Sequence, residues 1–194
     1  MGSLSVEDAG ARLGDVVAGV RSTGERAVLL LGGEAAGVIV RPRDLASMEE
    51  TIEMLSSADA MRAITEGDAA FMSGDILVGE SLKQIDTAGR FATAASSVPD
   101  DERWELMLSG SAHKAIGKLP GHVSDLVLRF MFERLQVDPQ RAGIELRGNL
   151  HRRMAARVET ETVVWRLDTV KHACRVLAVL HRGGLLGQAD APRL

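Results

Sequence analysis

The stretch AVLLLGGEAAGVIVRP, residues 27–42, decides how the first part of the chain folds. Two apolar runs flank Gly32-Gly33, and this arrangement predicts a β-hairpin because glycine readily adopts the positive φ angles of a tight turn. Pro42 then stands where a helix can begin, since proline is tolerated in the first helical turn. The hairpin is therefore expected to lead into a helix over residues 45–55.

The sequence on both sides of this hairpin predicts further helices. Upstream, residues 4–6 indicate a short strand, and residues 7–21 place apolar side chains on one face of an amphipathic helix. Ser5 is suited to cap that helix, and Gly24 is suited to end it. Downstream, a further helix is expected over residues 58–72.

The second half of the chain predicts a mixed unit of its own. A strand at residues 104–109 precedes two helices, and three more strands follow. The helices are expected at residues 111–119 and 122–137, and the strands at residues 153–158, 162–167 and 175–180. The order β-α-α-β-β-β indicates a sheet that buries both helices on one face. The chain as a whole is therefore expected to be α+β, with two small domains.

Charge divides the chain in the same way. Residues 1–98 contain 8 Lys and Arg against 15 Asp and Glu, a net charge of −7, whereas residues 99–194 contain 15 against 12, a net charge of +3. The acidic half can attract the basic half, the basic half can attract a polyanion, or each half simply solvates its own surface.

Composition also limits the class of protein. Cys174 is the single cysteine, so an intrachain disulfide is impossible. No apolar run approaches the roughly 18 residues that cross a bilayer. We therefore expect a soluble, cytoplasmic protein without a membrane partner. Metal, nucleotide and flavin motifs are absent from the sequence, and no metal or cofactor is expected.

The stretch LSVEDAGARLGDVVAGVRSTGERAVLLLGGEAAGVIVRPRDLASMEE resembles Phd/YefM-type antitoxins, through its opening, its Thr23-Gly24-Glu25 turn, its paired strands and its Pro42-to-helix step. The resemblance implies a helix–hairpin–helix domain over residues 1–73 that forms a homodimer or higher oligomer. It also implies binding of operator DNA, for which the candidates are Arg12, Arg41 and Arg43. Residues 4–35 have a net charge of −2, which disfavours a polyanion.

A second resemblance covers residues 103–186 and is to the RelE/ParE toxin superfamily. It rests on the segments SGSAHKAIGKLP, DPQRAGIELRGNL, MAARVETETVVWRLD and VLAVLHRGG. It implies a RelE-like β-α-α-β-β-β domain at residues 103–187, followed by a tail at 188–194. RelE-type toxins are ribosome-dependent mRNA endonucleases, which implies the ribosome and mRNA as partners. A ParE-like gyrase inhibitor is a further alternative.

The same resemblance indicates that several of the expected catalytic residues are missing from this sequence. Its catalytic candidates are Arg182, His181 and Arg157, and its RNA-binding candidates are Arg147, Arg152 and Arg153. Arginine binds phosphate bidentately, and histidine can transfer protons near neutral pH. The sequence has no tyrosine, however, and Met154, Ala156, Glu161-Thr162 and Leu186 stand where basic or tyrosine residues are expected. A toxin fold with weak or absent RNA cleavage is therefore expected, and enzymatic activity stays an open question.

Between the two domains, residues 74–102 are predicted to be a linker that also neutralises the toxin-like domain. Four apolar residues are expected to pack on that domain: Leu77, Val78, Leu82 and Ile85. Three acidic residues are expected to meet its arginines: Asp75, Glu80 and Asp86. Neutralisation can occur within one chain or between swapped chains.

Three functions remain from the sequence. The first is a self-neutralised, single-chain toxin–antitoxin-like protein whose nuclease has degenerated. The second is a latent ribonuclease released by cleavage of the linker, and the third is a DNA-binding transcriptional autorepressor.

Overall fold

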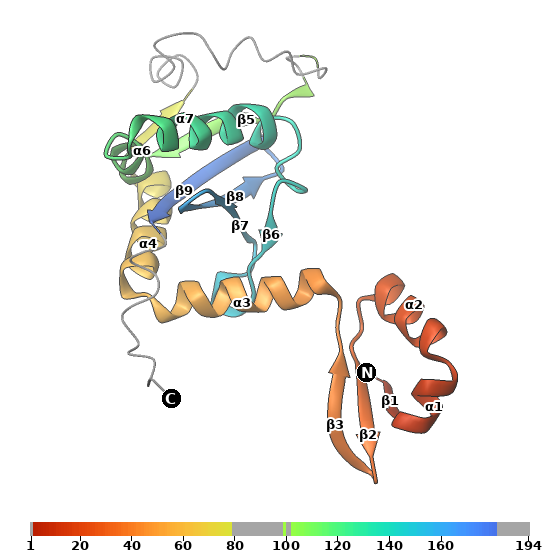
Figure 1. Cartoon of the computed structure of the whole chain (residues 1–194). Coiled ribbons are helices and arrows are strands. Elements are labelled where there is room, and N and C mark those ends of the chain that lie inside the picture. The colour runs from red at the N-terminus through yellow and green to blue at the C-terminus, as the bar shows by residue number, and fades with distance from the viewer. Residues whose placement is uncertain (1, 79–98, 100–101, 182–194) are drawn as a thin grey trace. The chain divides into compact units, whose positions relative to one another are not determined.

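The computed structural model describes residues 2–78, 99 and 102–181 (Figure 1). Two compact units divide the chain between Glu49 and Glu50. This division falls before residue 73, where the sequence predicted the end of the first domain. The helical residues after Glu49 belong to the second unit because their apolar side chains, among them Met54 and Ile64, are buried in its core.

The first unit contains a three-stranded sheet with order β1-β2-β3. Its elements are β1 (Gly2–Ser5), α1 (Val6–Ala11), α2 (Leu13–Thr23), β2 (Ala27–Leu31), β3 (Glu34–Ile39) and the start of α3 (Pro42–Ser56). Strand β1 runs parallel to β2, and β2 and β3 form the predicted antiparallel hairpin. Gly32 and Gly33 have φ angles of 60° and 87°, which confirms the turn that the glycine pair predicted.

The helix expected over residues 7–21 is interrupted, and this part of the prediction is wrong. Arg12 has a φ of −131° and separates α1 from α2. Gly10 and Gly14 stand on either side of it, and glycine is a poor helix former. The predicted ends are confirmed: Ser5 Oγ accepts a hydrogen bond from the N–H of Asp8 at 3.0 Å, and Gly24 ends α2 with a φ of 75°.

The second unit contains a six-stranded sheet with order β4-β5-β9-β8-β7-β6. Its strands are β4 (Ile76–Val78), β5 (Glu105–Ser109), β6 (Ile144–Glu145), β7 (Arg153–Val158), β8 (Glu161–Asp168) and β9 (Ala173–His181). Its helices are α4 (Ala58–Ser73), α6 (Gly110–Ile116), α7 (Gly121–Phe130), the π-helical turn η2 (Met131–Leu135) and the 3-10 turn η3 (Gly148–Leu150). The predicted order of strands and helices is observed from β5 to β9, and the sequence missed the edge strands β4 and β6.

Each face of this sheet carries its own buried cluster. Met131, Val163 and Trp165 belong to a cluster that also includes residues of α6 and α7. Met54, Val164 and Leu177 belong to a second cluster, to which α3 and α4 contribute. Neighbouring residues of β8 thus enter different clusters, because successive side chains of a strand point to opposite faces. Helix α4 lies against β9 in Figure 1 and contacts it directly.

The linker predicted at residues 74–102 begins with a strand. Strand β4 pairs antiparallel with β5, with Leu77 opposite Leu108, and Leu77 packs against the α7-side cluster. All three residues of β4 are half-buried at this edge of the sheet. Leu82 and Ile85, like Glu80 and Asp86, lie outside the described residues.

Candidate functional site

Three arginines lie side by side across the strands of the second unit. Arg153 of β7 is directly opposite Arg166 of β8, which is in turn opposite Arg175 of β9. Directly opposite residues share one face of a sheet, and like charges in these positions destabilise the pairing. These residues, called the arginine row below, therefore need anions close by.

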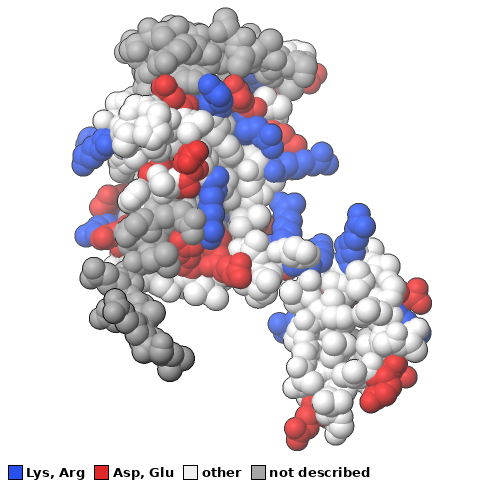
Figure 2. Space-filling view, in the orientation of Figure 1, with Lys and Arg blue, Asp and Glu red and all other residues white. Residues whose placement is uncertain are grey.

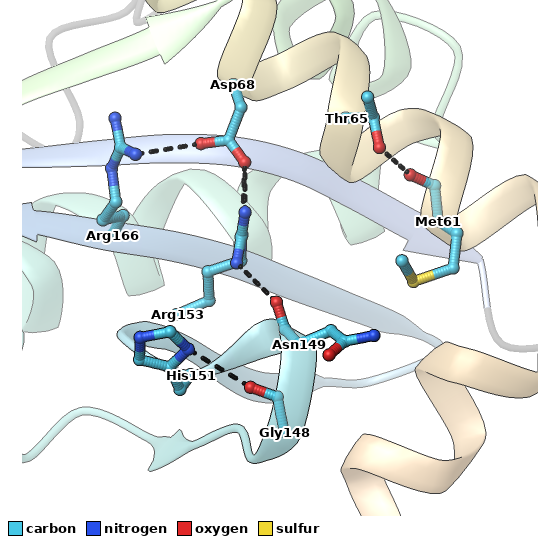
Figure 3. A network of polar contacts seen from close by, with 8 residues as sticks. All are labelled: Met61, Thr65, Asp68, Gly148, Asn149, His151, Arg153 and Arg166. Carbon is cyan, nitrogen blue, oxygen red and sulfur yellow. Dashed lines mark hydrogen bonds and ion pairs between the residues drawn. The ribbon is translucent and has the colours of Figure 1, made fainter.

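Asp68 of α4 provides one of these anions (Figure 3). Its Oδ2 accepts hydrogen bonds from Arg153 Nη2 at 2.7 Å and Nε at 3.2 Å, and its Oδ1 lies 3.3 Å from Arg166 Nη1. The Oδ1 contact is an ion pair without hydrogen-bond geometry, since this buried oxygen has no hydrogen-bond partner. One carboxylate thus holds two arginines, and Arg153 also donates to the carbonyl of Asn149 at 3.2 Å.

Arg175 is held by two different groups. Its Nη2 pairs with Asp168 of β8, and its guanidinium lies 5.5 Å from the centre of the Phe71 ring of α4. Its Nε is buried and has no hydrogen-bond partner. Helix α4 therefore places an anion and an aromatic ring on the arginine row.

A fourth arginine binds carboxylates of α3. Arg157 Nε donates to Glu50 Oε2 at 2.7 Å, and its Nη2 donates to Glu53 Oε2 at 2.8 Å. The Glu50 side chain is only 3% exposed, whereas Arg157 is 44% exposed. A buried carboxylate is costly without a charged partner, so Glu50 depends on Arg157 for its stability in this position.

Local sequence lets α4 approach the sheet closely. Ser57 caps the helix by accepting a hydrogen bond from the N–H of Ala60 at 3.2 Å. Midway along the helix, a Cβ atom on Gly67 would lie 2.3 Å from the carbonyl oxygen of Leu177 in β9. Only glycine fits there without movement, and its close approach brings Asp68 to the arginine row.

The neutralising residues expected from the sequence are only partly in these positions. Leu77 and Val78 lie in β4 at the edge of the sheet, whereas the acidic residues on the arginines come from earlier in the chain, in α3 and α4. The sequence analysis missed Glu50, Glu53, Asp68, Arg166 and Arg175. A two-residue turn at Glu159-Thr160 would have predicted the pairing of Arg153 with Arg166.

Two of the predicted catalytic residues, His181 and Arg157, do not come together. His181 Nδ1 lies 2.8 Å from Oε1 of Glu161, which is 2% exposed and also accepts a hydrogen bond from Thr160 Oγ1. Arg157 is opposite Thr162, the neighbour of Glu161, and therefore lies on the other face of the sheet. Arg182 is outside the described residues. The alternation of the strand thus separates His181 from Arg157.

The predicted RNA-binding residues occupy two environments. Arg147 and Arg152 are exposed next to η3, where the Arg147 N–H donates to Thr51 Oγ1 at 2.9 Å and the Arg152 N–H donates to Glu145 Oε1 at 3.2 Å. Arg153, in contrast, is occupied by Asp68. Figure 2 shows acidic and basic side chains interspersed on this unit.

The predicted DNA-binding residues lie in the first unit. Arg12 is exposed at the break between α1 and α2, and Arg43 is exposed in the first turn of α3. Arg41 binds Asp44 through Nε at 2.6 Å and Nη2 at 3.1 Å, and this hydrogen bonding raises the pKa of Arg41. Arg41 thus binds a carboxylate in the first turn of α3.

In the described part of the chain, no three His, Cys, Asp or Glu side chains gather as metal ligands. None of the helices described has both the length and the hydropathy of a membrane-spanning segment.

Comparison with known proteins gives a relative for part of the chain. A 77-residue segment, 40% of this chain, is 38% identical to the antitoxin RelB of Mycobacterium tuberculosis and covers 86% of that protein. The toxin–antitoxin complex RelBE2 of the same organism contains a chain that is 28% identical, with a TM-score of 0.39, over 41% of this chain and 98% of that one. No protein-family model matches.

Proposed function

The chain belongs to the RelB antitoxin family, and from this premise we propose that it is a single-chain toxin–antitoxin-like protein that neutralises itself. In this proposal, residues 50–78 are the neutralising segment and residues 103–187 the toxin-like domain. The observation that carries it is the set of ion pairs between α3 or α4 and the arginines of β7 and β8. Glu50, Glu53 and Asp68 together engage Arg153, Arg157 and Arg166.

Apolar packing supports the same assignment. Met54, Ala60 and Ile64 are almost completely buried against residues of β7, β8 and β9. Burial of side chains as large as Met54 and Ile64 contributes about 1.5–3 kcal/mol each, so the helices bind the sheet by more than charge. Because the helices are tethered to the sheet, their effective concentration is roughly millimolar. The closed arrangement is thus strongly favoured within one chain.

We propose that the nuclease of this domain is degenerate. The absence of tyrosine and the placement of His181 and Arg157 on opposite faces both support this proposal. A latent ribonuclease remains the alternative, since His181 is exposed and is held by the buried carboxylate of Glu161. DNA binding by Arg12, Arg41 and Arg43 in a dimer is the corresponding proposal for the first unit.

The test separates the two halves in growing bacteria. Residues 102–194 are expressed from one plasmid and residues 1–98 from another, and growth, mRNA integrity and co-purification are followed. We expect the two pieces to co-purify as a folded complex, and we expect residues 1–98 to relieve any growth arrest that the C-terminal piece causes. Intact mRNA during arrest supports a degenerate nuclease, and cleaved mRNA supports the latent ribonuclease.

Matched variants show whether the ion pairs are responsible. Glu50→Gln/Glu53→Gln/Asp68→Asn in residues 1–98 should weaken both rescue and co-purification. Glu49→Gln/Glu66→Gln, which changes exposed acidic residues of the same helices, should leave both intact. Normal growth with soluble C-terminal piece alone would support a degenerate toxin fold, and failure of the two folded pieces to co-purify would contradict self-neutralisation.

A further inference from the structure

Residues 58–78 contact the six-stranded sheet on both of its faces. Helix α4 contributes Ala60 and Ile64 to the cluster under α3 and α4, whereas Leu77 of β4 packs against the α7-side cluster. We propose that β4 is a latch, a strand that must leave the edge of the sheet before α4 can leave the arginine row. This inference rests on the proposed function in one respect, because it takes residues 50–78 to be the neutralising segment.

A short corner joins α4 to the latch. Gly74 ends α4 with a φ of 81°, and its carbonyl accepts a hydrogen bond from the N–H of Ile76 at 2.9 Å. Gly74 and Asp75 alone separate the helix from the strand, so the connection spans at most about 11 Å. Asp68 and Phe71 lie in the last two turns of α4, next to this corner. The groups that contact the arginine row are therefore at the end of the helix that β4 holds.

The latch is attached to the sheet through its backbone and through one apolar side chain. Leu77 is directly opposite Leu108 of β5, and both side chains belong to the α7 side of the sheet. The carbonyl of Asp75 accepts a hydrogen bond at 3.1 Å from the N–H of Gly110, the buried first residue of α6. A buried N–H that loses its partner destabilises the chain, so separation of the latch is opposed from the α6 side as well.

The order of opening follows from the unequal burial of the two attachments. Ile64 of α4 is 1% exposed, and Asp68 contacts two arginines, whereas the three residues of β4 are only half-buried at the edge of the sheet. Segments with few buried contacts open at a lower free energy than the core. We therefore expect β4 to separate first, and α4 then loses the contact that holds its C-terminal end.

The experiment follows amide hydrogen exchange of the full chain by mass spectrometry. Leu77→Ala removes the side chain with which the latch reaches the α7-side cluster and leaves every residue of α4 in place. We expect the amides of α4 to exchange at least about ten-fold faster than in the parent chain, while those of α7 keep their rates. Met72→Ala is the matched control, because this side chain in the last turn of α4 is 86% exposed, and it should change exchange by less than about two-fold.

A second variant tests the latch in the opposite direction. Val78 is directly opposite Met107, and such pairs have Cα atoms about 4.5–5.5 Å apart, within the range that a disulfide bridges. In Val78→Cys/Met107→Cys, oxidation should slow exchange in α4 at least about ten-fold relative to the reduced form of the same chain. Cys174 is fully buried and stays out of this pairing. The reduced form is its own control, so the test does not depend on the stability of Leu77→Ala.

Three results would overturn the latch: faster exchange in α4 than in β4 in the parent chain, unchanged exchange in α4 on forming the disulfide, or equal acceleration of α4 and α7 in Leu77→Ala. The last result would make β4 an ordinary part of the core. Failure here is distinguishable from failure of the proposed function. If residues 1–98 still co-purify with the C-terminal piece, self-neutralisation stands and only the latch is removed, whereas pieces that do not associate contradict self-neutralisation whatever the exchange rates.

Discussion

The two faces of the six-stranded sheet are built differently. The face under α6 and α7 is a continuous apolar cluster that includes Trp165, Met131 and Val176, all fully buried. The face under α3 and α4 combines an apolar cluster with four arginines and the carboxylates that bind them. Fully apolar packing is typical of a permanent core, whereas charged groups compensated by another segment are typical of an interface.

This difference bears on the proposed function. A toxin-like domain must keep one face folded in all states, and it must present the other face to whichever partner is bound. The α7 face meets the first requirement by burying Cys174 and Trp165. The α4 face meets the second because its arginines require anions, which either α4 or another ligand can supply.

The largest expected loss of stability comes from a substitution in the cluster under α6 and α7. Trp165→Ala removes a fully buried ring that packs edge-on against Phe130 and donates a hydrogen bond to the carbonyl of Pro139 at 3.1 Å. The free energy of unfolding should fall by about 3–5 kcal/mol, measured by urea denaturation with far-UV circular dichroism. A loss below about 1 kcal/mol would mean that this face is not the core of the unit.

The second prediction concerns a substitution that disturbs the α4 side of the sheet and leaves the α7 side intact. Gly67→Ala places a Cβ atom 2.3 Å from the carbonyl oxygen of Leu177, so α4 must move away from β9. We expect a loss of about 1–3 kcal/mol and faster amide hydrogen exchange in α4. Gly19→Ala is the matched control, because a Cβ atom there meets no atom within 4 Å.

Cys174 reports on the other face in the same experiment. The thiol is fully buried in the α7-side cluster, and burial raises its pKa, so little reactive thiolate is present. In Gly67→Ala, Cys174 should remain protected from thiol reagents while α4 exchanges its amides. Rapid labelling of Cys174 would show that the two faces open together.

The third effect measures one ion pair of the α4 side. A double-mutant cycle with Glu50→Gln and Arg157→Gln should give a coupling energy of about 1 kcal/mol, discounted because Arg157 is 44% exposed. A coupling near zero would indicate that α3 is held by its apolar residues alone. Such a result would also weaken the proposal that these carboxylates neutralise the arginines.

The elements themselves were largely readable from the sequence. Alternation of apolar residues predicted β7 with its observed bounds, and the glycine pair predicted the hairpin of the first unit. The two helices after that hairpin were also expected, at residues 45–55 and 58–72. Local patterns succeed here because each depends on residues that are close together in the chain.

The site was much less predictable because it joins residues that are far apart. Asp68 and Arg153 are 85 residues apart, and Glu50 and Arg157 are 107 apart. The sequence predicted a helix over residues 58–72, but a helical pattern does not specify which sheet the helix covers. Gly67 was a possible signal, since a glycine inside a helical pattern often marks a close backbone approach.

The smallest effect is expected for an ion pair on the outer side of α4. Arg62 and Asp59 form an i,i+3 pair whose side chains are 64% and 77% exposed. Water and salt screen such pairs, so Arg62→Gln should change the free energy of unfolding by less than about 0.5 kcal/mol in urea denaturation. The variant should also leave the protection of Cys174 unchanged. If Arg62→Gln instead lowered the free energy of unfolding as much as Glu50→Gln, the position of an ion pair at the sheet would not affect its contribution to stability. The distinction between an outer charge and an interface charge would then be contradicted.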